Sequence, residues 1–166
     1  MPIIDPFARH PLADGRQSER ALLVRHGVLR LFQRDGLAVV PELTLATGRR
    51  ADLVAVSRKG EILIVEVKSS IEDFRVDRKW PEYRAFCDRL YFATHPHVPA
   101  DIFPEDAGFL LSDGYGAELL REAPEHRLAP HVRKAMMLAF SRAAAFRLTA
   151  AELAGVGLKP VEGEEA

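Results

Sequence analysis

The sequence predicts an α+β fold in which helices flank a mixed β-sheet. An amphipathic helical pattern is followed by three apolar segments with turn-like links, which is typical of a helix before a three-stranded meander. A short helix and a further strand come next, so the predicted order is helix, strand, strand, strand, helix, strand. The 166 residues suffice for one domain with a single core.

The first part of the chain carries the clearest periodicity. A helix is expected from about Glu19 to Arg34, with Ser18 as its N-cap and Gly36 after its end. Its apolar residues fall on one stripe, which predicts a face that packs on the sheet. The strands that follow are expected at about Leu37–Leu45, Ala51–Ser57 and Glu61–Lys68.

The second part of the chain begins with residues 70–80, which are highly charged and carry aromatic residues. Pro81 suits the first turn of a short helix over residues 81–87. Strands are expected at about Arg89–Thr94 and Ala107–Leu111, and a C-terminal helix at about Pro130–Leu148. The apolar residues of that helix are alternately three and one positions apart, which predicts a buried stripe of Val132, Ala135, Met136, Ala139, Phe140 and Ala143.

The expected domain organisation is simple. Residues 1–16 form an irregular segment, because Pro2, Pro6 and Pro11 interrupt any periodic run. Residues 17–150 form a single domain, and the Gly-, Ala- and Glu-rich residues 151–166 form a flexible tail.

The compartment is expected to be cytoplasmic. Cys87 is the only cysteine, so no intrachain disulfide can form and a reducing compartment is favoured. The first residues lack the apolar region of a signal peptide, and no apolar run is long enough to cross a membrane. We therefore expect no membrane partner.

Charge is unevenly distributed although the net charge is only −1. Residues 1–60 and 128–150 are basic, and residues 61–127 are acidic. Basic flanks could hold phosphates while the acidic middle holds a cation. Ordinary solvated surface charge is the alternative, and charge alone favours it.

Three charged residues stand out on two neighbouring apolar segments. Asp52 lies in the second predicted strand, and Glu66 and Lys68 lie at the end of the third. Side chains alternate along a strand, so Glu66 and Lys68 project from the same face. Charged groups on an otherwise apolar strand need a partner, a metal or a function. The plain alternative is an ion pair between Glu66 and Lys68 where the strand meets solvent.

This pattern resembles the PD-(D/E)XK nuclease superfamily, whose signature would be Asp52, thirteen intervening residues and then Glu66-Val67-Lys68. Ala51 stands where the family name has proline. The run DFRVDRKWPEYRAFCDRLYFAT more closely resembles the bacterial MmcB-like DNA-repair proteins, and the resemblance covers about residues 18–148. It implies a restriction-endonuclease-like core and a metal-dependent deoxyribonuclease that acts in DNA repair.

The resemblance also implies roles for the individual residues. Asp52 and Glu66, with the carbonyl of Val67, would bind Mg²⁺ or Mn²⁺, because hard cations prefer oxygen ligands. Lys68 would support the attack on the phosphodiester electrostatically, since its ordinary pKa of ~10.4 makes it a poor base. Glu19 matches the position of a further metal-binding acid in several superfamily members. A first-turn glutamate that favours the helix dipole is the equal alternative for Glu19.

The accessory candidates are Glu42, Lys79 and Tyr83. Glu42 could add a ligand or point outward at a strand edge. Lys79 and Tyr83 resemble a Gln-x-x-x-Tyr element with lysine in place of glutamine, and Lys79 could contact phosphate. Anchoring of the segment to the core is favoured over base stacking for Tyr83. Asp73 and Asp77 are expected to pair with Arg75 and Arg78 at the surface, with water-mediated metal contact as the alternative.

The leading function is phosphodiester hydrolysis on DNA. The candidate backbone contacts are Arg20, Arg25, Arg49, Arg50, Lys79 and the Arg/Lys set of the C-terminal helix. A noncatalytic module that keeps the fold and binds nucleic acid or a repair protein is the main alternative. A structural subunit whose sheet edge recruits another protein is the third. Many enzymes of this class dimerise, so a homodimer is also a candidate.

Overall fold

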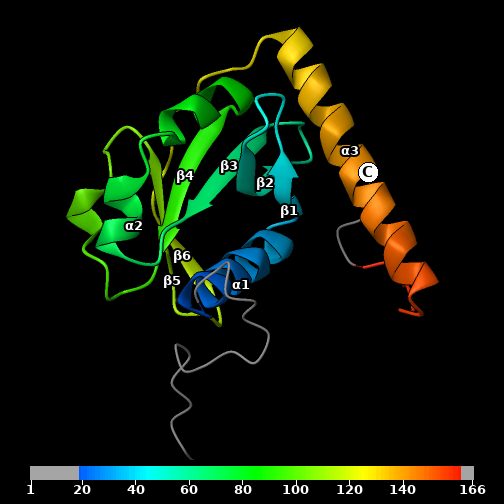
Figure 1. Cartoon of the computed structure of the whole chain (residues 1–166), viewed down its shortest axis with the longest axis horizontal. Coiled ribbons are helices and arrows are strands. Elements are labelled where there is room, and N and C mark those ends of the chain that lie inside the picture. The colour runs from blue at the N-terminus through cyan, green and yellow to red at the C-terminus, as the bar shows by residue number, and fades with distance from the viewer. Residues whose placement is uncertain (1–18, 162–166) are drawn as a thin grey trace, which may run out of the picture.

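The computed structural model of the chain describes residues 19–161. It has a mixed six-stranded sheet in the order β1-β2-β3-β4-β5-β6 with helices on both faces (Figure 1), which confirms the predicted fold class. The expected Ser18 cap and the irregular segment 1–16 lie outside the described residues. The elements are α1 (Glu19–Arg34), β1 (Ala38–Thr44), β2 (Arg50–Val56), β3 (Ile62–Val67), α2 (Ile71–Val76), η1 (Trp80–Phe86), β4 (Arg89–Thr94), η2 (Ala100–Ile102), β5 (Gly108–Ser112), β6 (Ala117–Arg121) and α3 (Pro130–Leu153).

The sheet combines two kinds of strand pairing. β1, β2 and β3 form an antiparallel meander, as predicted. β3 pairs with β4 and β4 with β5 in parallel, and β6 then returns antiparallel to β5. Every residue of β3 is buried, because helices cover both faces of the central strands.

Three elements of the structure differ from the sequence-based prediction. The charged stretch after β3 contains the short helix α2, which the side chain of Ser70 caps by accepting the N–H of Asp73 at 3.0 Å. Residues 117–121 form strand β6, although Glu and two leucines also suit a helix. The short helix predicted after Pro81 is a 3₁₀-helix that begins at Trp80.

Helix α1 covers one face of the sheet. Val24, Val28 and Leu31 pack against residues of β2, β3 and β4 that include Leu53 and Val65. The helix ends as expected, because Gly36 adopts a φ of 73° and the N–H of Leu37 donates to the carbonyl of Phe32 at 2.8 Å. This packing places the first turn of α1 on the opposite face from the side chains of Ile62 and Ile64.

The other face is covered by η1 and α3, and a third apolar cluster lies beneath α2. Tyr83 and Met136 pack with Val54, Ile62 and Ile64. In the third cluster, Phe92 of β4 packs with aromatic rings that include Phe74, Trp80 and Phe103. These contacts hold the segment between β3 and β4 against the sheet.

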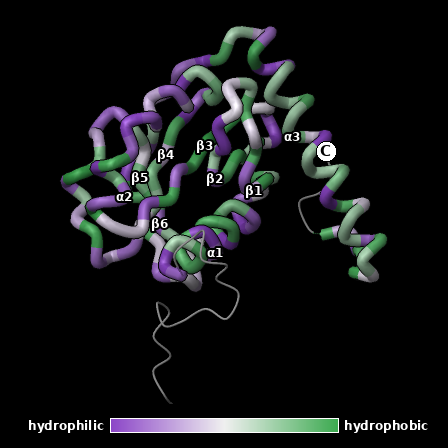
Figure 2. Tube along the Cα trace, viewed as in Figure 1, coloured by the Kyte–Doolittle hydropathy of each residue, from purple (hydrophilic) through white to green (hydrophobic). Residues whose placement is uncertain are grey.

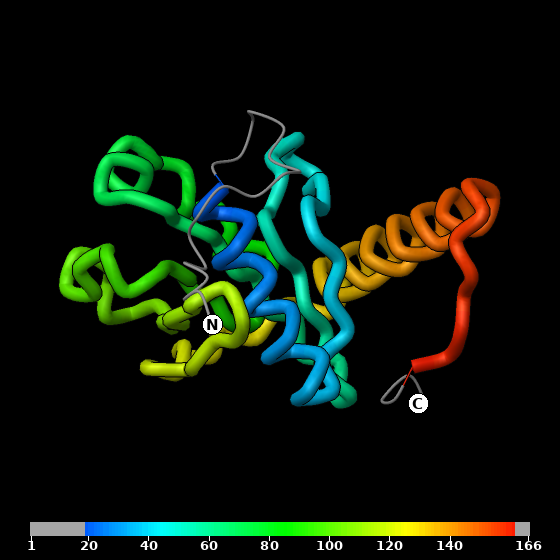
Figure 3. Tube along the Cα trace, turned by 90° about the horizontal axis from the view of Figure 1, so that it is seen from below, coloured from blue at the N-terminus to red at the C-terminus, as the bar shows by residue number. Residues whose placement is uncertain are grey.

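Helix α3 lies beside β1 and then runs past the body of the sheet (Figures 1 and 3). It continues to Leu153, beyond both the expected end at Leu148 and the expected domain boundary at 150. Met136 is buried, whereas Ala135 of the predicted stripe is exposed. Hydrophobic and hydrophilic residues are interspersed along the helix (Figure 2), and Met136 is its one buried residue in the described part of the chain. Within that range, no helix has the combination of length and hydrophobicity that crossing a bilayer requires.

Candidate metal and nucleic-acid site

Asp52 and Glu66 lie opposite each other on neighbouring antiparallel strands. Leu53 pairs with Val65, and continuing this register brings Asp52 against Glu66, so both side chains project from the face that η1 covers. The N–H of Asp52 donates to Oε1 of Glu66 at 3.2 Å, and the N–H of Val67 donates to Oδ2 of Asp52 at 2.8 Å. The sequence pattern therefore brings the two carboxylates together.

Each carboxylate keeps one oxygen without a hydrogen bond to residues 19–161, namely Oδ1 of Asp52 and Oε2 of Glu66. Burial raises the pKa of Asp52 above its ordinary value, and the nearby charges of Asp73 and Glu42 add to this effect. Burial and then the charge of Asp52 raise the pKa of Glu66 well above its ordinary value. Two desolvated carboxylates with mutual repulsion are a pair that a cation would stabilise.

Lys68 is buried, with 6 % of its surface exposed, and its partner is Asp77. The Nζ atom of Lys68 donates to Oδ2 of Asp77 at 2.6 Å. Burial alone would lower the pKa of Lys68, but the hydrogen bond that its ammonium donates to Asp77 raises this pKa above its ordinary value. Lys68 is therefore a protonated cation that lies beside the two carboxylates.

Asp77 is itself fixed by the turn that begins η1. Its Oδ1 atom accepts the N–H groups of Lys79 at 2.9 Å and Trp80 at 3.2 Å. The expected surface pairs of Asp73 and Asp77 with Arg75 and Arg78 are wrong, because the carboxylate of Asp73 accepts the N–H of Ser69 at 3.0 Å and Asp77 binds Lys68. The sequence did not indicate the contact between Asp77 and Lys68, because eight residues that include helix α2 separate them.

The accessory candidates occupy three different environments. The hydroxyl of Tyr83 donates to the carbonyl of Arg50 at 3.1 Å, and its ring lies in the core, so it anchors η1 to β2. The side chain of Lys79 is exposed. Glu42 has a φ of 52°, and its carboxylate lies 3.7 Å from Arg50.

The structure separates Glu19 from the carboxylate pair. Glu19 opens α1, on the other face of the sheet, and among the described residues it has no hydrogen bond or ion pair to Asp52 or Glu66. Within residues 19–161, no three His, Cys, Asp or Glu side chains are grouped so that they could share a metal ion. Any cation here would have two protein carboxylates as its ligands.

The basic candidates are partly neutralised. Arg49 bonds Glu82 through two nitrogens, and Arg50 lies near Glu42. Arg25 is half-buried, and its Nε is a buried donor that has no hydrogen-bond partner among residues 19–161. Arg20 is exposed, and its charge acts on His95, a buried residue directly after β4. Burial lowers the pKa of His95, and the charge of Arg20 lowers it further.

In α3, Arg147 bonds the carbonyls of Pro41 and Glu42, and Lys134 is exposed.

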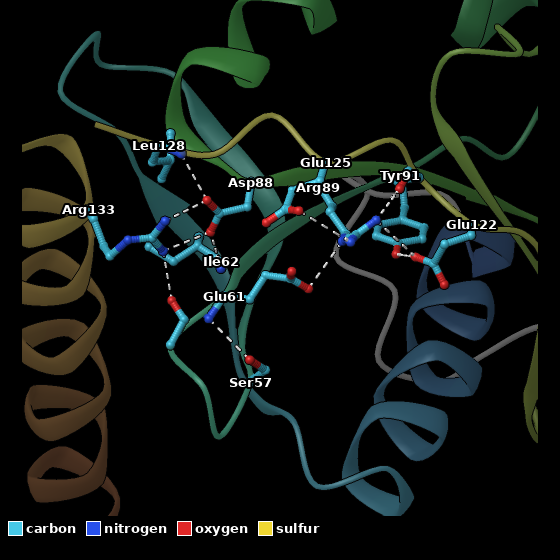
Figure 4. Close-up of polar contacts among 12 residues, drawn as sticks. Ser57, Glu61, Ile62, Asp88, Arg89, Tyr91, Glu122, Glu125, Leu128 and Arg133 are labelled. Atoms are coloured by element: carbon cyan, nitrogen blue, oxygen red, sulfur yellow. Dashed lines mark hydrogen bonds and ion pairs between the residues drawn. The ribbon is translucent and has the colours of Figure 1, made fainter. Parts of the chain in front are cut away.

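A second buried polar cluster, which sequence reasoning missed, lies at the opposite ends of the same strands (Figure 4). Asp88 accepts the N–H groups of Ile62 and Leu128 and two nitrogens of Arg133, at distances of 2.6–2.9 Å. These bonds fasten the start of α3 to β3. Their role is structural, because each oxygen of Asp88 is saturated with donors.

A family model described as "DNA repair protein MmcB-like" matches residues 8–155. The chain belongs to this MmcB-like family. The predicted family is thus confirmed, whereas placement in the PD-(D/E)XK superfamily stays a prediction. The MmcB-like chain is also similar to a solved structure, a protein of unknown function from Silicibacter pomeroyi, with 39 % identity and a TM-score of 0.76. That match covers 84 % of this chain and 94 % of the other. No curated protein matches the MmcB-like chain.

Proposed function

We propose that this MmcB-like protein is a metal-dependent nuclease that acts on DNA during repair. The observation that carries the proposal is the pairing of Asp52 with Glu66 on adjacent strands, beside the cation of Lys68. A DNA-repair role follows from the family, and the catalytic role is supported by the chemistry of these three side chains.

The carboxylate pair fits Mg²⁺ or Mn²⁺. Oδ1 of Asp52 and Oε2 of Glu66 are the oxygens available as ligands, and the carbonyl of Val67 is the third candidate. Mg²⁺ sites commonly use one or two carboxylates and complete their shell with waters and substrate phosphate. When bound, the ion would polarise the phosphate and lower the pKa of a water. The raised pKa values show that it is unfavourable for these buried carboxylates to carry their negative charges. A bound ion would offset this unfavourable free energy.

The protein's own groups would position and stabilise the substrate. Lys68 is protonated and cannot act as a base, so it would stabilise the negative charge that develops on the phosphate. Asp77 holds the ammonium of Lys68 in place. Arg20 and Lys79 are exposed and would contact the DNA backbone, whereas Arg49 and Arg50 would first have to exchange their carboxylate partners.

The direct test is cleavage by the purified full chain. Single-stranded, duplex, flap, junction and mismatched DNA would each be incubated with Mg²⁺ or Mn²⁺, and we expect cleavage of at least one form. Asp52→Asn and Lys68→Met should reduce the rate at least about 100-fold, since each removes electrostatic stabilisation of the transition state. Glu105→Gln is the matched control, because Glu105 is exposed and no hydrogen bond or ion pair among the described residues links it to Asp52 or Glu66. Cleavage that survives Asp52→Asn would contradict the proposal.

The second candidate function is a noncatalytic module that binds DNA or a repair protein. It is favoured by the burial of Glu66, which is 4 % exposed, and by the engagement of Lys68 with Asp77. Retarded DNA mobility without cleavage across all five substrates would support binding as the function. Loss of that retardation in Arg20→Ala, with Glu105→Gln unaffected, would locate the binding surface at the first turn of α1.

A further inference from the structure

A basic pocket lies where α1 ends. It has a volume of about 770 Å³ and is lined by Arg30 and Arg34 from the last two turns of α1 and by Arg58 from the turn after β2. Asp35 is the one acid among the described residues that line it, so the pocket has an excess of two positive charges. Asp52 lies near the start of β2, whereas Arg58 follows its end, so this pocket is separate from the carboxylate pair. A concave surface with this charge attracts anions.

The arginines of this pocket keep donors for a ligand. One terminal nitrogen of Arg30 donates to a backbone carbonyl of the β5–β6 turn at 3.0 Å, and Nε of Arg34 donates to Oδ1 of Asp35 at 3.0 Å. Arg58 is exposed and has no hydrogen bond or ion pair to the described residues. A Cβ atom on Gly36 would lie 3.5 Å from Nε of Arg58, so this guanidinium lies against the end of α1. The three cations therefore face one space and are only partly neutralised.

The chain itself returns to this pocket after α3. Gly155 follows the helix with a φ of 87°, and the N–H of Val156 donates to the carbonyl of Ala151 at 3.0 Å, so the helix ends in a glycine turn. The next residues run back from the end of α3 (Figure 3). Val161, the last described residue, lines the basic pocket together with its three arginines. The end of the described chain and the basic pocket thus lie at one place.

The sequence that follows Val161 is Glu-Gly-Glu-Glu, so residues 162–165 carry three carboxylates. Four extended residues reach about 13 Å, which brings every one of these carboxylates within range of the pocket that Val161 lines. A group tethered this closely has an effective concentration in the millimolar range. A free anion that enters the pocket must therefore compete with the acids of the chain itself.

We propose that the acidic segment 162–165 binds the basic pocket through ion pairs with Arg30, Arg34 and Arg58, and that it competes there with phosphate-bearing ligands. Charge complementarity and the position of Val161 both favour this occupant. Ion pairs at an exposed surface are individually weak, so the segment exchanges on and off the pocket and added salt releases it. The phosphates of a nucleic acid reach these three arginines only by displacing the segment. This proposal does not depend on nuclease activity.

Backbone ¹⁵N relaxation of the full chain at low salt tests the contact. We expect the order parameter of the Glu164 amide to exceed about 0.7 in the wild type and to fall below about 0.6 in Arg58→Gln. Lys59→Gln is the matched control, because Lys59 is exposed and adjacent to Arg58 but does not line the pocket. A wild-type value below about 0.6 would overturn the proposal, and so would an equal response of Arg58→Gln and Lys59→Gln.

Titration with inorganic pyrophosphate tests the competition, with the amide shifts of Arg34 and Gly36 as the readout. The tail variant replaces the three acids of the segment with glutamine: Glu162→Gln/Glu164→Gln/Glu165→Gln. It should bind pyrophosphate at least about threefold more tightly than the wild type, because the tethered competitor is gone. The control variant removes three exposed glutamates elsewhere and so has the same net charge: Glu72→Gln/Glu105→Gln/Glu118→Gln.

The control variant should bind pyrophosphate as the wild type does. Equal affinity of the wild type and the tail variant would mean that the pocket is open to external phosphate, and an equal gain in the control variant would assign the effect to net charge alone. Either result overturns the proposal. Neither measurement uses DNA cleavage, so failure here is distinct from failure of the proposed nuclease.

Discussion

The ammonium nitrogen of Lys68 lies 2.6 Å from Oδ2 of Asp77, nine residues further along the chain. The lysine of the Glu-Val-Lys sequence is thus held by a carboxylate that also begins η1. This contact joins the chemistry of the candidate site to the folding of the segment above it.

Replacing Asp77 should destabilise the protein through Lys68. Asp77→Ala leaves a buried ammonium without its partner, and we expect a loss of about 2–3 kcal/mol in the free energy of unfolding. The double variant Lys68→Met/Asp77→Ala should recover part of that loss, because no unpaired charge remains. Urea denaturation of the four proteins of this cycle measures the coupling. If Asp77→Ala and the double variant lose the same free energy of unfolding, that loss comes from the turn that Asp77 fixes, and the ion pair with Lys68 adds nothing to stability.

Glu66→Gln should make the protein more stable while it abolishes the response to metal. The raised pKa of Glu66 means that the wild-type protein loses stability as the pH rises from the ordinary carboxylate range toward the folded-state value, a loss that glutamine removes. We expect a gain of about 1 kcal/mol at neutral pH, with the amide oxygen still able to accept the N–H of Asp52.

Thermal unfolding with and without Mn²⁺ tests both parts of this prediction. The ion should raise the melting temperature of the wild type, because it binds the folded state alone, and should leave that of Glu66→Gln unchanged. The control Glu105→Gln should respond as the wild type does. An equal shift for all three proteins would place the ion elsewhere.

The bond between Asp88 and Arg133 should make the protein sensitive to acid. Burial alone would raise the pKa of Asp88, but the hydrogen bonds from Arg133, Ile62 and Leu128 lower it to about 2 from an ordinary 3.8. The bonds therefore contribute their full stability above the ordinary value and lose it as the pH falls toward 2.

This pH dependence can be measured from thermal unfolding between pH 2 and 5. Arg133→Met should lower the melting temperature at pH 5 and flatten its dependence below pH 4. Arg142→Met is the control, because Arg142 is exposed and lies over Phe146. If the melting temperature of Arg133→Met falls as steeply below pH 4 as that of the wild type, the acid sensitivity comes from other carboxylates.

A methyl group at Gly27 should disturb the contact between α1 and the β5–β6 turn. A Cβ atom there would lie 2.0 Å from Oγ of Ser112 and 2.5 Å from the carbonyl oxygen of Gly116. Gly27→Ala should therefore cost about 1–3 kcal/mol, despite the better helix propensity of alanine. Gly116→Ala, where a Cβ meets no atom within 4 Å, should be nearly neutral in the same denaturation experiment.

The central fold could be predicted because its sequence is locally consistent. α1 has a continuous apolar stripe and a glycine at its end, and the three strands after it alternate with turn-like links. β4 was placed at the observed bounds, since RLYFAT lies between a short helix and a proline-flanked loop. The pairing of Asp52 with Glu66 follows directly from two strands of a hairpin.

Contacts between segments far apart in sequence could not be predicted. The partner of Lys68 depends on how α2 and the following turn fold back over β3. The saturation of Asp88 depends on Arg133, 45 residues away. β6 was missed because AELLR has no alternation, which reflects a strand that is exposed on both sides instead of one half-buried face.

The obstruction of β1 by Pro41, Glu42 and Arg147 has a consequence for how copies of this chain can add to one another. Because Pro41 lacks an N–H and Arg147 occupies the carbonyls of Pro41 and Glu42, a strand from another molecule would find few free backbone groups there. The native protein is therefore protected at β1 against edge-to-edge aggregation.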